Sequence, residues 1–195
     1  MDVDGKVVVV TGAAGGIGFA LAERFAAEGA QVVLSDLDPV ATAARAQSIG
    51  GYGVAANVGV EADIARLTEA AIARFGRIDM FCSNAGIAVD GGPEVPTEQW
   101  SRVYAVNVLA HVYAAKYALP GMLERGDGYL LNVASAAGLL TEFHAAPYAV
   151  TKHAAVGLAE WLAITYGDRG IKVSVLCPAA VKTPIIAGIA SLEKT

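Results

Sequence analysis

The sequence predicts a single α/β domain, built as a doubly wound parallel sheet of about six strands with helices on both faces. Short runs rich in Val, Ile and Leu alternate with longer helical patterns along the chain, and strands that alternate with helices usually pair in parallel. The runs are almost continuously apolar, as in strands that helices cover on both faces. No repeat, low-complexity tract or linker divides residues 1–195, so we expect one domain.

Six runs are expected as strands and five as helices. The strand runs are 6–11, 31–36, 53–58, 78–83, 129–134 and 172–177. The helical patterns are 17–28, 39–48, 61–75, 97–124 and 148–168, with Thr97 as a candidate cap. Right-handed crossovers between neighbouring strands then predict the order 3-2-1-4-5-6.

Composition excludes several classes of function. The net charge is −5 and no block of Lys or Arg occurs, so we expect no binding to nucleic acid or to anionic lipid. Charged residues interrupt every apolar stretch before the roughly 20 residues that a membrane span needs. The acidic start is not typical of a secretory signal, and we expect a cytoplasmic protein. Cys82 and Cys177 lie in apolar runs without a metal-binding pattern, so we expect both to be buried and reduced and no metal site.

A glycine-rich turn joins the first strand to the first helix. It includes Gly12, Gly16, Ile17 and Gly18. Glycines allow a tight turn and a close approach to a ligand, and the N–H groups at a helix start favour a diphosphate. The sequence therefore predicts a dinucleotide site here, with an ordinary strand-to-helix turn as the alternative.

An acidic residue ends the second strand. Asp36 stands where a carboxylate would accept hydrogen bonds from an adenosine ribose and would repel a 2′-phosphate. Neither Gly15 nor Leu37 supplies a cation for that phosphate, and the nearest base, Arg45, belongs to a helix. NAD is therefore favoured over NADP. The alternative is that Asp36 caps a helix or faces solvent in a turn.

Three residues in the second half of the chain, Ser135, Tyr148 and Lys152, predict proton transfer. Tyr148 and Lys152 are spaced by four residues and share one face of a helix. A nearby cation favours the phenolate, so this pair indicates a tyrosine that acts as a base near neutral pH. Ser135 ends an apolar run, and its hydroxyl could hold a substrate oxygen beside the phenol. Together the three residues favour chemistry at an alcohol or carbonyl, although each alone could be a packing or surface residue.

The motifs occur in an order typical of one known family. They are Thr11-Gly12-x-x-x-Gly16-x-Gly18, Asn84-Ala85-Gly86, Asn107, Ser135 and Tyr148-x-x-x-Lys152. Through them the chain resembles the short-chain dehydrogenase/reductase family over residues 6–183. The resemblance implies a Rossmann-like fold and an oxidoreductase that transfers a hydride between a secondary alcohol or ketone and a nicotinamide.

The resemblance also implies a role for each catalytic residue. Tyr148 would be the acid/base, and Ser135 would hold and polarise the substrate oxygen. Lys152 would make the tyrosine more acidic and would hydrogen-bond the nicotinamide ribose. Asn107 would hold a water molecule that connects the lysine to solvent.

Cofactor contacts follow from the same resemblance. They are Asn57 and Val58 near the adenine, Asn84, Ala85 and Gly86 beneath the adenosine, and Pro178, Val181 and Thr183 at the nicotinamide. Asn57 stands where aspartate is more usual, so an ionic contribution is absent. Ala179 stands where glycine is usual, so we expect the turn to differ slightly.

The segment before Tyr148 predicts the class of substrate. The residues between Ser135 and Tyr148 are mostly apolar, which favours a hydrophobic alcohol or ketone near Leu140, Phe143 and His144. Chains of this family usually continue with helices that cover the substrate and with a seventh strand. We therefore expect the lid to be missing and 172–177 to be an edge strand.

The resemblance implies that the helices 97–124 and 148–168 pair across a twofold axis, so we expect a homodimer or homotetramer. Two alternatives to an NAD(H)-dependent dehydrogenase stay open. One is an NADPH-dependent 3-oxoacyl thioester reductase. The other is a dinucleotide-binding protein without turnover.

Overall fold

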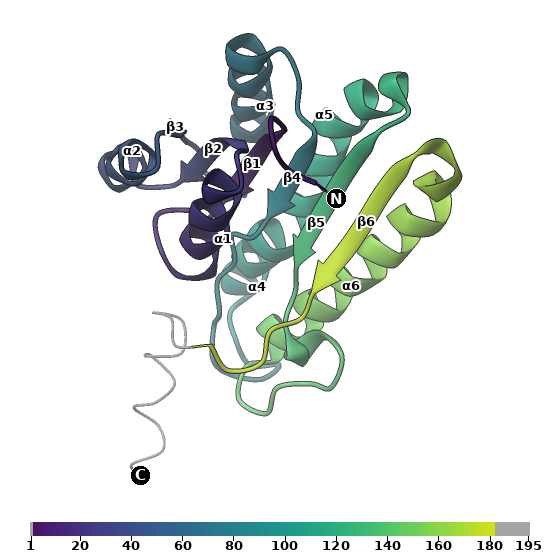
Figure 1. The fold of residues 1–195 in the computed structure, drawn as a ribbon. Coiled ribbons are helices and arrows are strands. Elements are labelled where there is room, and N and C mark those ends of the chain that lie inside the picture. Colours follow the sequence, from purple (N-terminus) through teal and green to yellow (C-terminus); the bar gives the residue numbers. More distant parts are fainter. Residues whose placement is uncertain (1, 182–195) are drawn as a thin grey trace.

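The computed structural model describes residues 2–181 and contains the predicted parallel sheet. Its six strands follow the order β3-β2-β1-β4-β5-β6, as expected (Figure 1). The strands are β1 Val7–Thr11, β2 Gln31–Asp36, β3 Tyr52–Ala55, β4 Met80–Ser83, β5 Gly128–Val133 and β6 Ile171–Leu176. All neighbouring strands pair in parallel. β6 lies at one edge of the sheet, which was also predicted.

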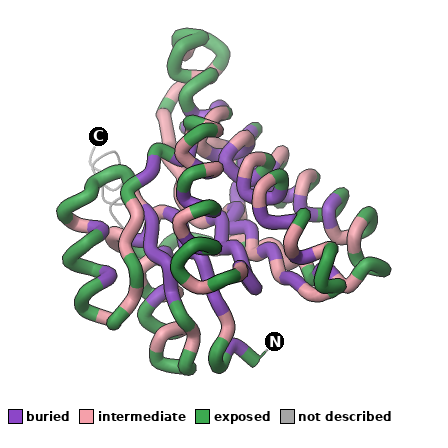
Figure 2. The backbone as a smooth tube through the Cα atoms, turned by 90° about the horizontal axis from the view of Figure 1, so that it is seen from above, coloured by how far each residue is buried: buried purple, intermediate pink, exposed green. Residues whose placement is uncertain are grey.

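Helices cover the sheet from both sides. They are α1 Gly16–Ala27, α2 Pro39–Ser48, α3 Glu61–Phe75, α4 Thr97–Tyr104, α5 Ala110–Arg125 and α6 Ala146–Tyr166. Alternate residues of β1 pack into different cores: Val8 and Val10 pack with Ala22 of α1, whereas Val9 packs with Leu67 of α3. Because both faces of the strand are covered, its sequence is continuously apolar rather than alternating. Figure 2 shows the buried residues gathered along the strands and the inner helix faces.

The long helix expected over 97–124 is divided by a π-helical turn. α4 runs into a π-helix at Ala105–Leu109, and α5 continues to Arg125. Turns of this kind contain an extra residue and often mark functional sites. The expected cap is wrong, because Pro96 occupies the N-cap position and no side chain caps α4.

Two further expectations need correction. The third strand ends at Ala55 rather than at residue 58, because Asn57 forms a turn in which its Oδ1 accepts a hydrogen bond from Gly59 N at 3.0 Å. Cys82 is buried as expected, and burial raises its pKa to about 12. Cys177 is only half-buried, contrary to the prediction, because it follows the end of the edge strand β6.

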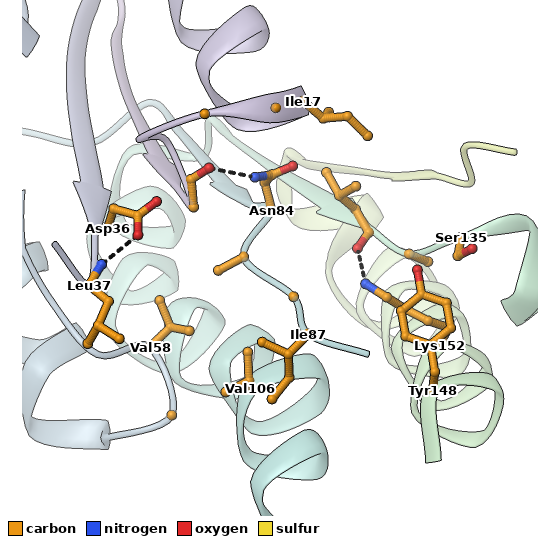
Figure 3. Close-up of a pocket in the computed structure, with 18 of the residues that line it drawn as sticks. Ile17, Asp36, Leu37, Val58, Asn84, Ile87, Val106, Ser135, Tyr148 and Lys152 are labelled. Carbon is orange, nitrogen blue, oxygen red and sulfur yellow. Dashed lines mark hydrogen bonds between the residues drawn. The ribbon is translucent and has the colours of Figure 1, made fainter. Parts of the chain in front are cut away.

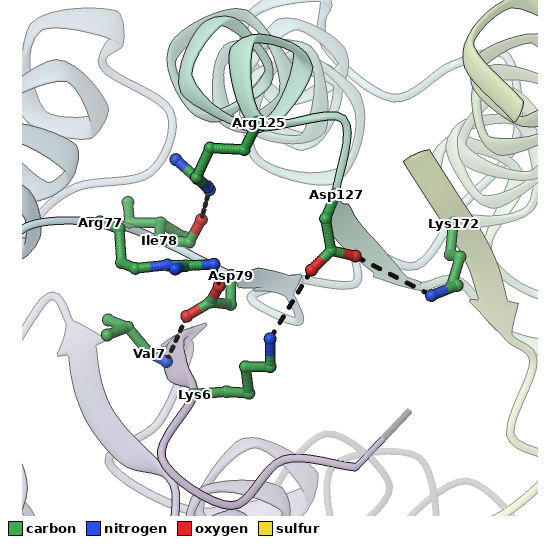
Figure 4. Close-up of polar contacts among 8 residues, drawn as sticks. All are labelled: Lys6, Val7, Arg77, Ile78, Asp79, Arg125, Asp127 and Lys172. Atoms are coloured by element: carbon green, nitrogen blue, oxygen red, sulfur yellow. Dashed lines mark hydrogen bonds and ion pairs between the residues drawn. The ribbon is translucent and has the colours of Figure 1, made fainter. Parts of the chain in front are cut away.

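Acidic residues connect the strands at the amino end of the sheet (Figure 4). Asp79 is 1% exposed, pairs with Arg77 and accepts the first backbone N–H of β1 at 2.9 Å. Asp127 lies between Lys6 and Lys172, at 3.6 Å and 3.9 Å from their ammonium nitrogens. These contacts join β1, β4, β5 and β6 at the end opposite to the carboxyl ends of the strands.

Within residues 2–181, no helix is both long and apolar enough to cross a membrane.

Candidate active site

A cavity of about 630 Å³ lies at the carboxyl ends of the strands. This edge is where doubly wound sheets bind their ligands, and the volume is typical of a small-molecule site. The predicted residues that line it are Gly12, Gly16, Ile17, Asp36, Leu37, Asn57, Val58, Asn84, Ala85, Gly86, Ser135, Tyr148, Lys152, Pro178 and Val181. Two predicted residues, Gly18 and Asn107, are buried outside this lining. Thr183 lies outside the described residues.

The cavity has two chemically different ends, which Figure 3 shows. Asp36 and Leu37 lie at one end, beside Val58. Ser135 and the Tyr148–Lys152 pair lie at the other, with the glycine-rich turn and Asn84 between the two ends. The predicted ribose-binding acid and the predicted acid/base thus belong to one continuous site.

The glycine-rich turn has the form expected for a diphosphate cradle. Gly12 and Gly16 adopt φ values of 65° and 55°, which other residues rarely adopt. A Cβ on Gly18 would lie 2.1 Å from the carbonyl oxygen of Gly12, so this glycine lets α1 pack closely under the turn. The N-cap is Gly15, no side chain caps α1, and its first turn contains no acidic residue. Its N–H groups are therefore available to an anion.

Asn84 fastens this turn to β4. Its side-chain nitrogen donates to the carbonyl oxygens of Thr11 at 2.9 Å and Gly12 at 3.2 Å. The hydroxyl of Thr11 in turn accepts hydrogen bonds from the backbone N–H groups of Asn84 and Ala85. Asn84 therefore shapes the cradle as well as lining the cavity.

Asp36 is held by the same turn. Its carboxylate accepts hydrogen bonds from Ala14 N at 2.9 Å and Leu37 N at 2.7 Å. Arg45 holds the other side of Ala14, because its Nε donates to the Ala14 carbonyl oxygen at 3.2 Å. The guanidinium of Arg45 also lies over the ring of Phe19, 4.3 Å from its centroid. The sequence pattern gave no signal for this contact between α2 and the turn.

The cavity wall also contains residues that the sequence interpretation missed. Arg102, Ala105 and Val106, from α4 and the π-helical turn, line the cavity together with Ile87. They are distant in sequence from every recognised motif, so only the fold brings them to the site. Asn57 also lines the cavity, although its amide oxygen already accepts a hydrogen bond within its own turn.

Lys152 is buried beside Tyr148 on α6. It is 3% exposed, and its ammonium donates to the carbonyl oxygen of Val133 at 3.0 Å. The nitrogen lies 5.6 Å from the centroid of the Tyr148 ring. Burial lowers the pKa of Lys152 to about 8, partly offset by the nearby Cys177. Ser135 ends the loop after β5, and its Oγ accepts a hydrogen bond from Ala137 N at 3.1 Å, which leaves its own proton free for another acceptor.

Asn107 lies in the π-helical turn and is fully buried. Its Oδ1 accepts a hydrogen bond from Ile87 N, and its Nδ2 donates to Ile87 O, both at 2.9 Å. Nδ2 also donates to the Thr151 hydroxyl at 3.1 Å. The side chain thus joins three segments next to the lysine. Its role in holding a water molecule stays a prediction.

A model of the family described as short chain dehydrogenase matches residues 6–193. The chain belongs to this family. The match includes the glycine-rich turn, Asp36, Ser135 and the Tyr148–Lys152 pair, and therefore the whole of the cavity described above. Short-chain dehydrogenases act on CH–OH groups with NAD(P), so this chain is an oxidoreductase of alcohols and ketones.

Relatives within the short-chain dehydrogenases act on diverse alcohols. The chain is 39% identical to 1-deoxy-11-beta-hydroxypentalenate dehydrogenase of Streptomyces exfoliatus, covering 97% of this chain and 72% of that protein. It is 37% identical to meso-2,3-butanediol dehydrogenase of Serratia marcescens, and the match covers 96% of this chain and 76% of that protein. A solved structure of 3-ketoacyl-(acyl-carrier-protein) reductase from Brucella melitensis, complexed with NADH, has a TM-score of 0.92 at 34% identity and covers 95% and 79%.

The loop expected to contact substrate lies outside the cavity of this dehydrogenase. Leu140 is 81% and Phe143 92% exposed, and neither they nor the exposed His144 line the cavity. Ala179 lines it without the left-handed backbone expected of a glycine, since Thr141 is the only non-glycine residue of 2–181 with a positive φ. The same residues contain no group of three or more His, Cys, Asp or Glu side chains that could hold a metal ion.

Proposed function

We propose that this short-chain dehydrogenase uses NAD(H) to interconvert an apolar secondary alcohol and its ketone, with Tyr148 as the acid/base. The buried ammonium of Lys152, 5.6 Å from the Tyr148 ring in a cavity that reaches Asp36, is the observation that carries the proposal. A buried positive charge stabilises the negative charge that develops on the phenol oxygen.

Each residue has a distinct part in the proposed reaction. Tyr148 takes the hydroxyl proton when the alcohol is oxidised and returns it when the ketone is reduced. The Ser135 hydroxyl donates to the substrate oxygen and so fixes the carbinol carbon. A bound nicotinamide would accept or donate the hydride. Lys152 holds its charge near the phenol throughout.

The preference for NAD rests on the charge of Asp36. Its carboxylate would accept hydrogen bonds from the ribose hydroxyls and would oppose a 2′-phosphate. Arg45 contacts the turn that holds Asp36, but its guanidinium already binds the Ala14 carbonyl oxygen and the Phe19 ring. Arg102 is a cation that lines the cavity itself. The Brucella relative complexed with NADH supports the same preference.

An apolar substrate is supported by the described wall of the cavity. Beside Ser135, this wall includes the apolar residues Val133 and Ala134. The pentalenate and butanediol dehydrogenases differ greatly in the size of the substrates that their names give, so we propose only the class of alcohol.

The test is to titrate the chain with NADH and NADPH by fluorescence and then to add a panel of ketones while following nicotinamide absorbance. Tyr148→Phe should abolish hydride transfer, because general acid–base catalysis contributes about 10²–10⁴-fold to the rate. The same variant should leave NADH affinity within about twofold. Tyr166→Phe, at the other end of α6, is the matched control and should retain activity. Retained turnover in Tyr148→Phe would refute the assigned acid/base.

Asp36→Ala should narrow the preference for NADH over NADPH by about tenfold, because a charge-assisted hydrogen bond contributes about 1.5–3 kcal/mol. Dissociation constants for both cofactors measure this ratio. Asp38→Ala removes the same charge two residues away, where the carboxylate caps α2, and should leave the ratio unchanged. An unaltered ratio in Asp36→Ala would remove this residue from the ribose site.

Reduction of 3-oxoacyl thioesters is the second candidate function, favoured by the likeness to the Brucella reductase. A 3-oxoacyl thioester in the ketone panel separates it from the first, because only one of the two substrate classes should give efficient turnover. Tight NADH binding without turnover of any ketone would instead support a non-catalytic dinucleotide-binding protein.

We also propose that two copies pair through the helices 97–124 and 148–168. Exposed apolar side chains on these helices support it: Tyr104, Val112, Val150, Trp161 and Ile164. Trp161 is 56% and Ile164 84% exposed, which is unusual for such large apolar groups on one helix. Light scattering on the eluting protein would distinguish monomer, dimer and tetramer.

A further inference from the structure

A second polar pair is buried behind the active-site lysine. His111 on α5 is 1% exposed, and Asn132 on β5 is 3% exposed. The Nδ1 atom of His111 lies 2.8 Å from Oδ1 of Asn132. Neither residue lines the cavity, and none of the sequence motifs includes them.

This pair is unfavourable as a stabilising element alone. His111 Nε2 and Asn132 Nδ2 are both buried without a protein hydrogen-bond partner. A buried polar atom in that state usually costs about 1–3 kcal/mol, so two apolar side chains would suit the same space better. The position of the pair relative to the catalytic groups offers another explanation.

The pair is connected to Lys152 through the backbone of β5. Asn132 directly precedes Val133, whose carbonyl oxygen accepts the hydrogen bond from the lysine ammonium. His111 is the second residue of α5, directly after the π-helical turn that contains Asn107. Figure 3 shows Lys152 on α6 with this hydrogen bond as a dashed line.

The imidazole is neutral in this position. Burial lowers the pKa of His111 to about 4, the hydrogen bond with Asn132 opposes that effect, and the charge of Lys152 lowers the pKa further. The charge of the lysine therefore acts on the ring. A neutral ring adds no second positive charge beside the ammonium.

We propose that His111 is a positioning residue for Lys152. Its Nδ1–H donates to Asn132 Oδ1 and fixes the end of β5, so that the Val133 carbonyl holds the ammonium beside Tyr148. The catalytic part of this inference rests on the proposed function, whereas the hydrogen bond and the placement of the lysine exist without cofactor or turnover.

The first test uses the cofactor-free chain. Nitrogen-15 NMR of the three histidines should show one neutral ring with its proton on Nδ1, assigned to His111 by its loss in His111→Leu. The side-chain Cε–Nζ resonance of Lys152 should shift in His111→Leu. Leu119→Ala, a core substitution two turns along α5, should leave it in place. A proton on Nε2, a cationic ring, or an unmoved lysine resonance would overturn the proposal.

The second test uses turnover. His111→Leu should lower kcat by about tenfold with little change in KM for the ketone, because small displacements of a catalytic group cost up to about 10²-fold. His111→Gln keeps a donor for Asn132 and should recover kcat to within about twofold. Leu119→Ala should lower the Tm but retain kcat.

The two tests separate the possible failures. An unchanged kcat in His111→Leu, or equal losses in all three variants, would refute the positioning role. Absence of turnover in the unmodified chain would instead refute the proposed function, while the NMR result would still decide the placement of the lysine.

Discussion

Replacing Lys152 by methionine should stabilise the fold while it abolishes catalysis. The ammonium is 3% exposed, and burial lowers its pKa from 10.5 to about 8. A pKa shift of this size destabilises the folded state by about 3 kcal/mol, since one pKa unit corresponds to about 1.4 kcal/mol. Losing the hydrogen bond to the Val133 carbonyl costs about 1 kcal/mol. We therefore expect Lys152→Met to be more stable than the unmodified chain by about 2 kcal/mol at pH 7.

The difference in stability between the two proteins should depend on pH, in a direction set by the lowered pKa of Lys152. The folded protein binds the lysine proton less tightly than the unfolded chain does, so the penalty is fully present below pH 8. As the pH rises from about 8 towards 10.5, the folded state holds a neutral lysine and the unfolded state a charged one. By pH 9.5 the free energy of unfolding of the unmodified chain should therefore rise by about 2 kcal/mol relative to that of the variant.

Urea unfolding followed by tryptophan fluorescence measures both free energies, at pH 7.0, 8.5 and 9.5 without cofactor. Lys172→Met is the matched control, because that side chain is 62% exposed and its ammonium remains in water. A variant less stable than the unmodified chain at pH 7, or a stability difference that does not vary with pH, would refute the assignment of a desolvated lysine.

Two further predictions concern packing. Gly86→Ala places a Cβ 3.2 Å from the ammonium of Lys152, so kcat should fall by about tenfold with little change in Tm. Gly157→Ala is the control, because its Cβ would have no atom within 4 Å, and it should retain kcat in the same assay. Asp79→Ala leaves Arg77 without its partner and should cost about 2–3 kcal/mol in urea unfolding; a loss below about 0.5 kcal/mol, as for an exposed pair, would show that this contact contributes little.

Most of the fold follows from hydrophobic patterning, and the sequence therefore predicted it well. β2 has the expected bounds 31–36, and α3 the expected bounds 61–75. The largest miss is the π-helical turn, because one extra residue leaves the run 97–124 helical in composition and changes only the phase of its apolar face. Strand ends moved where side chains such as Asn57 began a turn.

The candidate site was predictable where its residues follow directly after strands. Asp36 and Ser135 come at strand ends, so the parallel topology alone gathers them at one edge of the sheet. Contacts between distant elements were not predictable. Arg45 reaches the glycine-rich turn from α2, and Arg102 reaches the cavity from α4. Neither contact has a local pattern, and both depend on how helices pack.

The π-helical turn also has a consequence for how this chain could vary. An additional residue offsets the helical phase by about 100°, so α4 and α5 present their faces independently. Val106 can face the cavity while Met122 remains in the core. Deleting one residue from 105–109 would restore an unbroken α-helix and turn the cavity-facing side chains of α4 away, with α5 undisturbed. The turn thus separates the part of the helix that meets ligand from the part that the core holds in register.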